Sequence, residues 1–200
     1  MQEKAKKIAE KYHENQKRKG GDDYIKHPKR VAENISKLID DKELISAAYL
    51  HDTIETAQEN LETLKKLKQE IKKLSPLVLE YVENLSHNKE IENYEEYIKR
   101  ISQDNKLLVL KFCDIIDNLS DNPTEQQKEK YKKALTILLA KISEKKAFFL
   151  FCWNIMGYKI IEFISIIIFK EKFNHKISCF IILVFYTNHI SIHRIFKKIY

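Results

Sequence analysis

Residues 44–55 read LISAAYLHDTIE, an apolar run in which a histidine and an aspartate stand side by side. Apolar residues recur at nearly every position, so a helix formed here has almost no face for water. An ionised carboxylate in such surroundings is seldom tolerated unless it is paired or bound to a metal ion, because desolvation would otherwise neutralise it. His51 and Asp52 are therefore the first candidates for a functional site.

The same anomaly recurs further along the chain, where residues 107–119 read LLVLKFCDIIDNL. Asp114 lies at the centre of this second apolar run. Lys111, Asp114 and Asn118 are spaced i, i+3 and i+7, so they share one face of a helix. Two buried helices are thus each expected to bury an acid.

Two more residues extend this group of polar side chains. Glu55 follows His51 by one helical turn and is expected on the same face, and a further histidine, His27, precedes the proline at position 28. Imidazole nitrogens mixed with carboxylate oxygens suit Mn, Fe, Co or Zn, whereas an all-oxygen set would favour Mg or Ca. An alternative stays open at this point: Asp52 and Asp114 are satisfied by buried Lys or Arg, or cap neighbouring elements.

The composition predicts an all-α fold. The chain has 200 residues, enough for a domain with a substantial core, and only three Gly and three Pro. Helix formers dominate and turn punctuation is scarce. The apolar spacing and cap residues predict helices over about 2–17, from Pro28, over Lys42 to Glu55, over 58–73, from Ser75-Pro76 toward Leu85, over Asn93 to Leu119 with a break near Asp104-Asn105, and from Asn122-Pro123-Thr124 to 141–146.

The charge and the N-terminal residues narrow the partners and the location. A net charge of +7 is compatible with a polyanionic ligand, but it is also ordinary for a Lys-rich helical protein. Nucleic-acid binding has only this charge in its favour and is not predicted. Residues 1–10 show no apolar h-region, so no secretory signal is visible and a cytoplasmic location is expected.

Several motifs in order make the sequence similar to the HD-domain hydrolases of the Rel/Spo alarmone enzymes, which include the stand-alone small alarmone hydrolases. A His-Pro pair, an HD-x-x-E motif and a distant Lys-x-x-Asp-x-x-x-Asn motif together are far more specific than an HD pair alone. The resemblance is carried by His13, Gln16, Arg18, Gly21, Tyr24-Ile25, His27-Pro28, Val31-Ala32, Ala47-Ala48, residues 50–55, residues 94–98, residues 110–114 and Asp117-Asn118, and it ends near Leu139.

The resemblance implies an all-α HD helical bundle and a single ion, Mn²⁺ or another divalent transition metal, held by His27, His51, Asp52 and Asp114. In the alarmone hydrolases the ion and an adjacent acid pair activate a water, which releases pyrophosphate from the 3′ position of guanosine tetra- or pentaphosphate. For this chain it implies hydrolysis of guanosine 3′,5′-bis(diphosphate) to GDP and pyrophosphate. Glu55 matches the first acid of the pair and is the candidate general base or water-orienting residue.

The resemblance also implies a set of substrate-binding residues. Arg18 matches the residue that stacks on the guanine base, a role that suits a planar cation. Asn118 matches a residue that contacts the nucleotide sugar. Lys19 and Lys111 are candidates for neutralising phosphate, although Lys19 is also readily explained as solvated surface. His13 is expected to hold the first helix in place rather than to bind metal.

The sequence departs from the family at the second acid, which is replaced by Thr56. A hydroxyl supplies neither the negative charge nor the basicity of a carboxylate. Asp117 also differs from the His of the long Rel/Spo enzymes and is more like a group of stand-alone HD phosphohydrolases. Two alternatives therefore stand beside alarmone hydrolysis: hydrolysis of another nucleotide or phosphate ester, and a catalytically silent nucleotide-binding domain.

The composition changes after residue 146, which predicts a catalytic domain over 1–146 and a hydrophobic extension over 147–200. Residues 147–169 are long enough to span a bilayer, but Lys159 and Glu162 would each cost roughly 3 kcal/mol at its centre. Three explanations stay open: a segment without selected structure, as a shifted reading frame would produce, membrane attachment, and extra helices. Membrane attachment is not favoured, and the sequence does not determine an oligomeric state.

Overall fold

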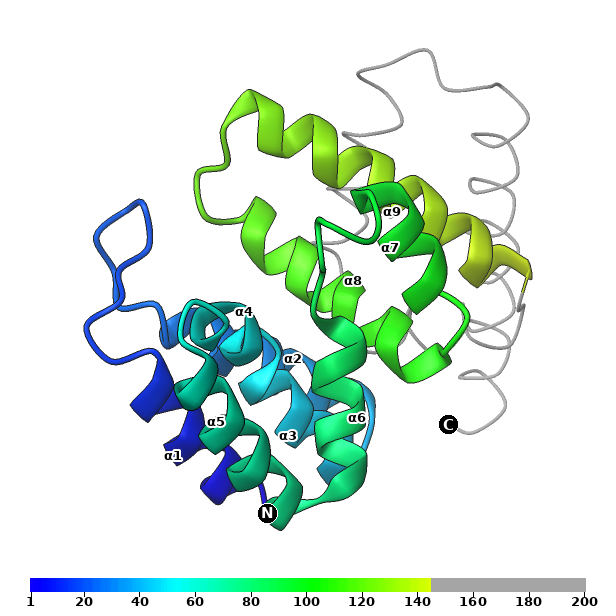
Figure 1. Ribbon diagram of the computed structural model, residues 1–200. Coiled ribbons are helices and arrows are strands. Elements are labelled where there is room, and N and C mark those ends of the chain that lie inside the picture. Colours follow the sequence, from blue (N-terminus) through cyan, green and yellow to red (C-terminus); the bar gives the residue numbers. More distant parts are fainter. Residues whose placement is uncertain (145–200) are drawn as a thin grey trace, which may run out of the picture. The chain divides into compact units, whose positions relative to one another are not determined.

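The computed structural model describes residues 1–144. The domain boundary predicted near residue 146 and the hydrophobic extension over 147–200 lie outside these residues. Within them the regular secondary structure is helical, apart from an isolated bridge between Lys17 and Asp23. The described helices are α1 (Gln2–Tyr12), α2 (Lys26–Leu38), α3 (Lys42–Leu50), α4 (Thr53–Ala57), α5 (Leu61–Leu74), α6 (Pro76–Leu85), α7 (Tyr94–Ile101), α8 (Asn105–Leu119) and α9 (Glu125–Glu144). The predicted all-α fold is confirmed (Figure 1).

Side-chain caps explain where most of these helices begin. Asp41 accepts a hydrogen bond from the Leu44 N–H at the start of α3, and Ser75 accepts one from Val78 while Pro76 opens α6. Asn93 and Glu96 form a capping box at the start of α7. Such side-chain acceptors satisfy backbone N–H groups that have no partner within the helix. The breaks that the sequence predicts at Ser75-Pro76 and Asp104-Asn105 are confirmed.

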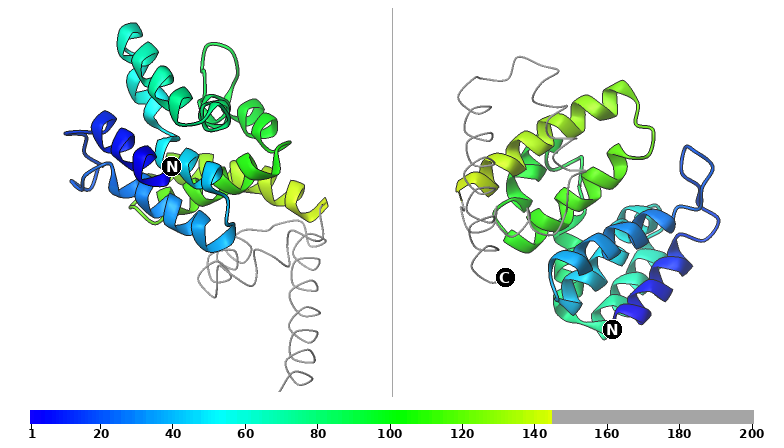
Figure 2. Two further views of the ribbon diagram at one scale, coloured as in Figure 1. Left: turned by 90° about the horizontal axis from the view of Figure 1, so that it is seen from below. Right: turned by 180° about the vertical axis from the view of Figure 1, so that it is seen from behind.

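The helix α3 lies at the centre of the fold. It contacts α1, α2, α6 and α8, and Leu44, Ala47, Ala48 and Leu50 are completely buried in it. The helix α8 contacts α2, α3 and α6 and also α9, so it connects the N-terminal helices with the pair α7 and α9 (Figures 1 and 2). The two apolar runs that contain acidic residues, 44–55 and 107–119, are therefore neighbours in the core.

The first helix is shorter than the sequence predicts. It ends at Tyr12 instead of near residue 17, because Asn15 adopts a left-handed backbone conformation with φ of 62°. A helix cannot continue through such a residue, and asparagine is among the few side chains that adopt this conformation readily. The chain then forms the loop that carries Arg18 and Lys19.

The predicted single helix over residues 42–55 is wrong at one point, because it is interrupted at His51 and Asp52. Side chains there compete for the backbone: Thr53 Oγ1 donates to the Leu50 carbonyl at 2.6 Å, and His51 Nδ1 lies 2.8 Å from the Ala48 carbonyl. Such local bonds offer the backbone an alternative to the regular helical ladder. The break places His51 at the end of α3 and Glu55 in the short helix α4.

Among residues 1–144, none of the helices is both long enough and apolar enough to span a membrane. The stretch 147–169, for which a membrane span is weighed above, lies outside the described residues.

Candidate metal centre

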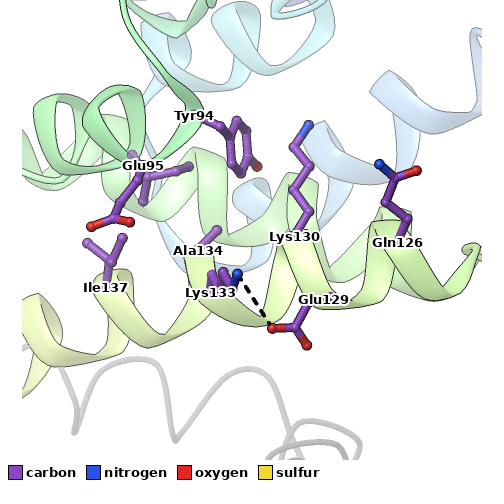
Figure 3. A pocket seen from close by; sticks show the side chains of 9 residues that line it. Tyr94, Glu95, Gln126, Glu129, Lys130, Lys133, Ala134 and Ile137 are labelled. Atoms are coloured by element: carbon purple, nitrogen blue, oxygen red, sulfur yellow. Dashed lines mark ion pairs between the residues drawn. The ribbon is translucent and has the colours of Figure 1, made fainter.

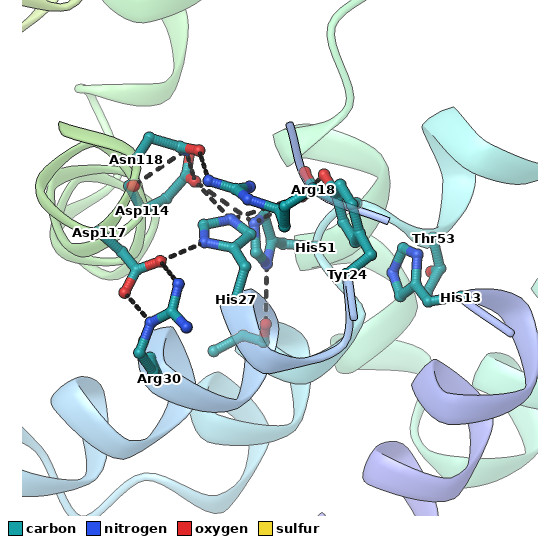
Figure 4. Close-up of polar contacts among 12 residues, drawn as sticks. His13, Arg18, Tyr24, His27, Arg30, His51, Thr53, Asp114, Asp117 and Asn118 are labelled. Carbon is teal, nitrogen blue, oxygen red and sulfur yellow. Dashed lines mark hydrogen bonds and ion pairs between the residues drawn. The ribbon is translucent and has the colours of Figure 1, made fainter. Parts of the chain in front are cut away.

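Three helices bring the predicted metal-binding residues together (Figure 4). His27 lies near the start of α2, His51 at the end of α3 and Asp114 in α8. Each is at most 3% exposed. One potential ligand atom from each of the three lies within 4.8 Å of those of the other two. The sequence separates these residues widely, and the packing of α2, α3 and α8 makes them neighbours.

Asp52 borders the same point. Its Oδ2 lies 3.2 Å from His51 Nε2 and 3.6 Å from His27 Nε2, while Asp114 Oδ1 lies 3.1 Å from His27 Nε2 and 3.5 Å from His51 Nε2. The Tyr24 hydroxyl donates a hydrogen bond of 2.7 Å to Asp52 Oδ2. All four residues predicted to hold the ion therefore surround one small space.

The surroundings of the two histidines determine which ring nitrogen faces that space. His51 Nδ1 lies 2.8 Å from the Ala48 carbonyl, and His27 Nδ1 lies 2.6 Å from Asp117 Oδ2. Both partners only accept hydrogen bonds, so each Nδ1 carries a proton and Nε2 is the nitrogen of each ring that faces the space. Both Nε2 atoms are buried and have no hydrogen-bond partner among the described residues. Two buried imidazole nitrogens without a partner, facing two carboxylates, are a donor set that fits a divalent transition metal ion.

The charges around Asp114 keep it ionised. Burial by itself would raise its pKa, but the Lys111 ammonium 2.8 Å from Oδ2 and the two histidines hold that pKa well below its usual range. The pKa of Asp52 is likewise lowered, because His51 outweighs the effect of burial. The sequence left open that a buried lysine pairs with Asp114 in place of a metal ion. Such a lysine is present, but it pairs with only one of the two carboxylate oxygens. Lys111 occupies Oδ2, and Oδ1 faces the histidines.

Two of the predicted substrate-binding residues, Arg18 and Asn118, lie together beside the centre. The Arg18 Nη2 donates to Asn118 Oδ1 at 2.9 Å, and its Nε donates to Asp121 at 2.6 Å. Its guanidinium carbon lies 5.5 Å from the centroid of the Tyr24 ring. Asn118 in turn donates to Asp114 Oδ1 at 2.6 Å. Lys19 differs from these residues, since it is exposed and no contact of its side chain is found within residues 1–144.

Glu55 lies at an exposed position in α4. Its Oε1 accepts a hydrogen bond of 3.1 Å from the backbone N–H of His87, in the loop between α6 and α7. Thr56, which replaces the second acid of the family, donates to the Asp52 carbonyl at 3.1 Å. Its hydroxyl is therefore used within the backbone turn that positions Asp52.

His13 is buried but does not belong to the metal-binding group. Its Nδ1 lies 2.8 Å from Gln16 Oε1, and its ring is 4.8 Å from that of Tyr24. These contacts hold the end of α1 against the loop that carries Tyr24. They agree with the supporting role expected of His13.

Sequence reasoning missed two residues next to His27. Asp117 receives the His27 Nδ1–H and also pairs with Arg30, whose Nε and Nη2 donate to its two oxygens at 2.7 and 2.9 Å (Figure 4). The sequence contains a signal for this arrangement. His27 and Arg30 are spaced i, i+3 on α2, as are Asp114 and Asp117 on α8, so each pair shares one helix face.

Sequence reasoning also missed a lysine near a pocket between α7 and α9. The pocket has a volume of about 400 Å³, and Tyr94, Ala134 and Lys130 are among the residues that line it (Figure 3). Lys130 Nζ lies 3.9 Å from the centroid of the Tyr94 ring, and burial, aided by Lys111, lowers the pKa of Lys130. The Tyr94 hydroxyl is buried and has no hydrogen-bond partner among residues 1–144.

Comparison with known proteins agrees with this geometry. The family described as "HD domain" matches residues 5–143. A GTP pyrophosphokinase of Streptomyces coelicolor is 42% identical over 64 residues, which are 32% of this chain and 8% of that protein. A guanosine-3′,5′-bis(diphosphate) 3′-pyrophosphohydrolase of Aquifex aeolicus is 35% identical over 97 residues, which are 48% of this chain and 14% of that protein. The similarity thus spans only a small part of each relative's length.

Proposed function

The chain belongs to the HD domain family, and we propose that it is a metal-dependent phosphohydrolase whose substrate is a phosphorylated nucleotide. The first substrate to test is guanosine 3′,5′-bis(diphosphate), which water would convert to GDP and pyrophosphate by breaking the bond between the 3′ oxygen and phosphorus. The observation that carries the proposal is the pair of buried, unpartnered Nε2 atoms of His27 and His51 directed at Asp52 and Asp114.

These four residues would hold the ion, with Mn²⁺ proposed first and other divalent transition metals as alternatives. When bound, such an ion lowers the pKa of a coordinated water and offsets the charge that develops on the phosphoryl group. Lys111 supports the site from the protein side, because its ammonium keeps Asp114 ionised.

Four side chains would act directly on the reactants. Glu55 would orient the attacking water or accept its proton, since it is the carboxylate of α4 and lies four residues after His51. Arg18 and Asn118, which already hydrogen-bond to each other beside Asp114, would bind the base and the sugar. Lys130 would contact a phosphate group, because it is exposed to incoming ligands and its ammonium has no carboxylate at ion-pair distance among the described residues.

A second candidate function rests on Thr56. Its hydroxyl donates to the Asp52 carbonyl, so this position supplies no second acid. A domain without that acid could bind a nucleotide without hydrolysing it, or hydrolyse a different nucleotide or phosphate ester. The net charge alone supports no nucleic-acid partner, and the cytoplasmic location and a role in the stringent response stay predictions.

The proposal is tested on the full chain loaded with Mn²⁺, with pyrophosphate release from guanosine 3′,5′-bis(diphosphate) as the readout. We expect turnover in the native protein and none in His51→Ala, which loses a metal ligand. Glu55→Gln should retain the metal and lose about 10²- to 10⁴-fold in kcat, as is usual for a general base. Glu59→Gln is the matched control, because Glu59 is also an exposed acid and lies two residues after the end of α4, the helix that contains Glu55.

Three results would contradict parts of this proposal. A folded, metal-loaded protein without turnover would reject this substrate and lead to a panel of other nucleotides and phosphate esters. If Glu55→Gln turned over every nucleotide of the panel at the native rate, Glu55 would not be the base. If the native protein bound nucleotides but hydrolysed none of the panel, the protein would be a nucleotide-binding domain without catalytic activity.

A further inference from the structure

The two histidines of the candidate metal centre are held by different chemical groups. His51 Nδ1 contacts a neutral backbone carbonyl, that of Ala48. His27 Nδ1 contacts the carboxylate of Asp117, which is 4% exposed and is itself bound by Arg30 through two hydrogen bonds. The centre is therefore asymmetric. Two charged residues, Asp117 and Arg30, lie behind His27, whereas His51 contacts only a neutral carbonyl through its Nδ1.

We propose that Arg30 and Asp117 form a positioning pair that holds His27 ready to bind the metal ion. The inference rests on the proposed metal-dependent function and assigns to that site two residues outside its ligand set. Neither residue would touch the substrate. Both would act through His27, by fixing the orientation of its ring and the location of its proton.

Competition between two carboxylates for that proton explains why His27 needs such support. Asp114 Oδ1 lies 3.1 Å from Nε2, and Asp117 Oδ2 lies 2.6 Å from Nδ1. If the neutral ring gave its N–H to Asp114, the nitrogen that faces the centre would be blocked as a ligand. A shorter contact to the ionised Asp117 favours the opposite tautomer, in which Nε2 is bare.

Arg30 completes the arrangement in two ways. Its planar guanidinium binds both oxygens of Asp117, which sets the plane of the carboxylate. Its positive charge also lies directly beside the two carboxylate oxygens, at 2.7 and 2.9 Å. A carboxylate whose two oxygens are paired with a guanidinium accepts the His27 Nδ1–H and has no proton of its own to offer. Carboxylates behind metal-binding histidines typically change metal affinity by 10- to 100-fold.

The test measures the affinity of the full chain for Mn²⁺ by calorimetry, without substrate. Asp117→Asn should bind Mn²⁺ about 10- to 100-fold more weakly than the native protein. Glu92→Gln is the matched control: Glu92 is also a carboxylate held by two hydrogen bonds from one arginine, Arg100, but on the surface near α7. The control should bind Mn²⁺ with native affinity.

A double-mutant cycle then tests whether Arg30 acts through Asp117. Arg30→Met should weaken Mn²⁺ binding, and it should add little further loss when Asp117 is already Asn. Nitrogen-15 spectra of the Zn²⁺-loaded protein supply a second readout, in which His27 Nδ1 should carry a strongly hydrogen-bonded proton in the native protein and lose that signature in Asp117→Asn. A merely structural contribution would lower the free energy of unfolding without changing this signature.

The outcomes separate this inference from the proposed function. If the native protein binds no divalent metal, both fail. If it binds Mn²⁺ and both Asp117→Asn and Arg30→Met bind it equally well, only the positioning pair is refuted. Should Asp117→Asn not fold, Arg30→Met decides, because the Arg30 side chain is 40% exposed and its loss leaves Asp117 in contact with His27.

Discussion

Lys111 and Lys130 show how the same side chain acquires different roles from its surroundings. Lys111 has Asp114 at 2.8 Å, and although burial opposes it, this carboxylate raises the pKa of Lys111 well above its ordinary value. Lys130 is exposed, but its ammonium lies 3.9 Å from the centroid of the Tyr94 ring, and the desolvation there lowers its pKa. Lys111 thus already forms an ion pair within the protein, whereas the ammonium of Lys130 is suited to bind an anionic ligand.

We predict that Lys130→Met raises the KM for guanosine 3′,5′-bis(diphosphate) about 10- to 100-fold, because a charged hydrogen bond is worth roughly 1.5–3 kcal/mol. The contribution of Lys130 should fall as the pH rises through its lowered pKa, since only the cation below that pKa attracts phosphate. Steady-state kinetics over a pH series measure both effects.

Lys133→Met is the control for this prediction. Lys133 lies on the same helix and lines the same pocket, but its ammonium already lies 3.8 Å from the carboxylate of Glu129. Equal KM values for the two variants and the native protein would show that Lys130 does not bind a phosphate group.

At the level of the element, α3 has to be fixed at both ends, because it carries His51 at its C-terminal end. At the other end Asp41 accepts a hydrogen bond of 2.9 Å from the Leu44 N–H, and its Oδ2 lies 2.6 Å from the Lys106 ammonium. The second contact joins the start of α3 to the start of α8, which carries Asp114. One side chain thus contributes to the placement of both helices.

We predict that Asp41→Ala lowers the free energy of unfolding by about 1–2 kcal/mol, as the loss of an N-cap does. Burial would raise the pKa of Asp41, but the hydrogen bonds from Lys106 and Leu44 outweigh it and lower the pKa from the ordinary 3.8. The stabilisation is therefore complete above that ordinary value and is lost as the pH falls through the lowered pKa. Urea unfolding at a series of acid pH values measures this loss.

Asn60→Ala is the comparison for Asp41→Ala. Asn60 caps α5 by accepting a hydrogen bond from the Thr63 N–H, but its amide carries no charge. Its contribution should not change over the same pH range. A cost of Asp41→Ala that stayed constant in acid would contradict the role assigned to the ionised carboxylate.

For the whole molecule, the centre joins α2, α3 and α8, so metal binding should stabilise the entire described fold. An ion that binds only the native state adds about 2.7 kcal/mol at 100 times its Kd. For a chain of this size we predict a rise in Tm of roughly 5–10 °C. Thermal unfolding with and without Mn²⁺ measures the rise.

The variant His27→Gln checks that the stabilisation comes from this centre. It keeps a side chain of similar volume but lacks the imidazole nitrogen, so its Tm should respond much less to Mn²⁺. A rise as large as that of the native protein would place the ion elsewhere. Mg²⁺ should stabilise less than Mn²⁺ does, because a site with two imidazoles suits the softer ion.

Local sequence was sufficient for the helical class, for most helix boundaries and for the residues that could bind a metal ion. Caps such as Ser75 with Pro76 act within a few residues, so they can be read directly. His51, Asp52 and Asp114 stood out because an acid in an apolar run needs a partner. The break in the helix at His51 and Asp52 could not be predicted in this way. It depends on the hydrogen bonds that the Thr53 and His51 side chains form with backbone carbonyls.

Contacts between distant residues established the rest. Arg30 and His27 meet Asp117 across 87 and 90 residues of sequence. Lys130 comes to lie over the Tyr94 ring only because α9 packs against α7. Neither arrangement follows from periodicity, since periodicity defines the face of a helix and not the helix that it meets. Which nitrogen of His27 faces the centre is likewise decided by Asp117, a partner that only the folded chain supplies.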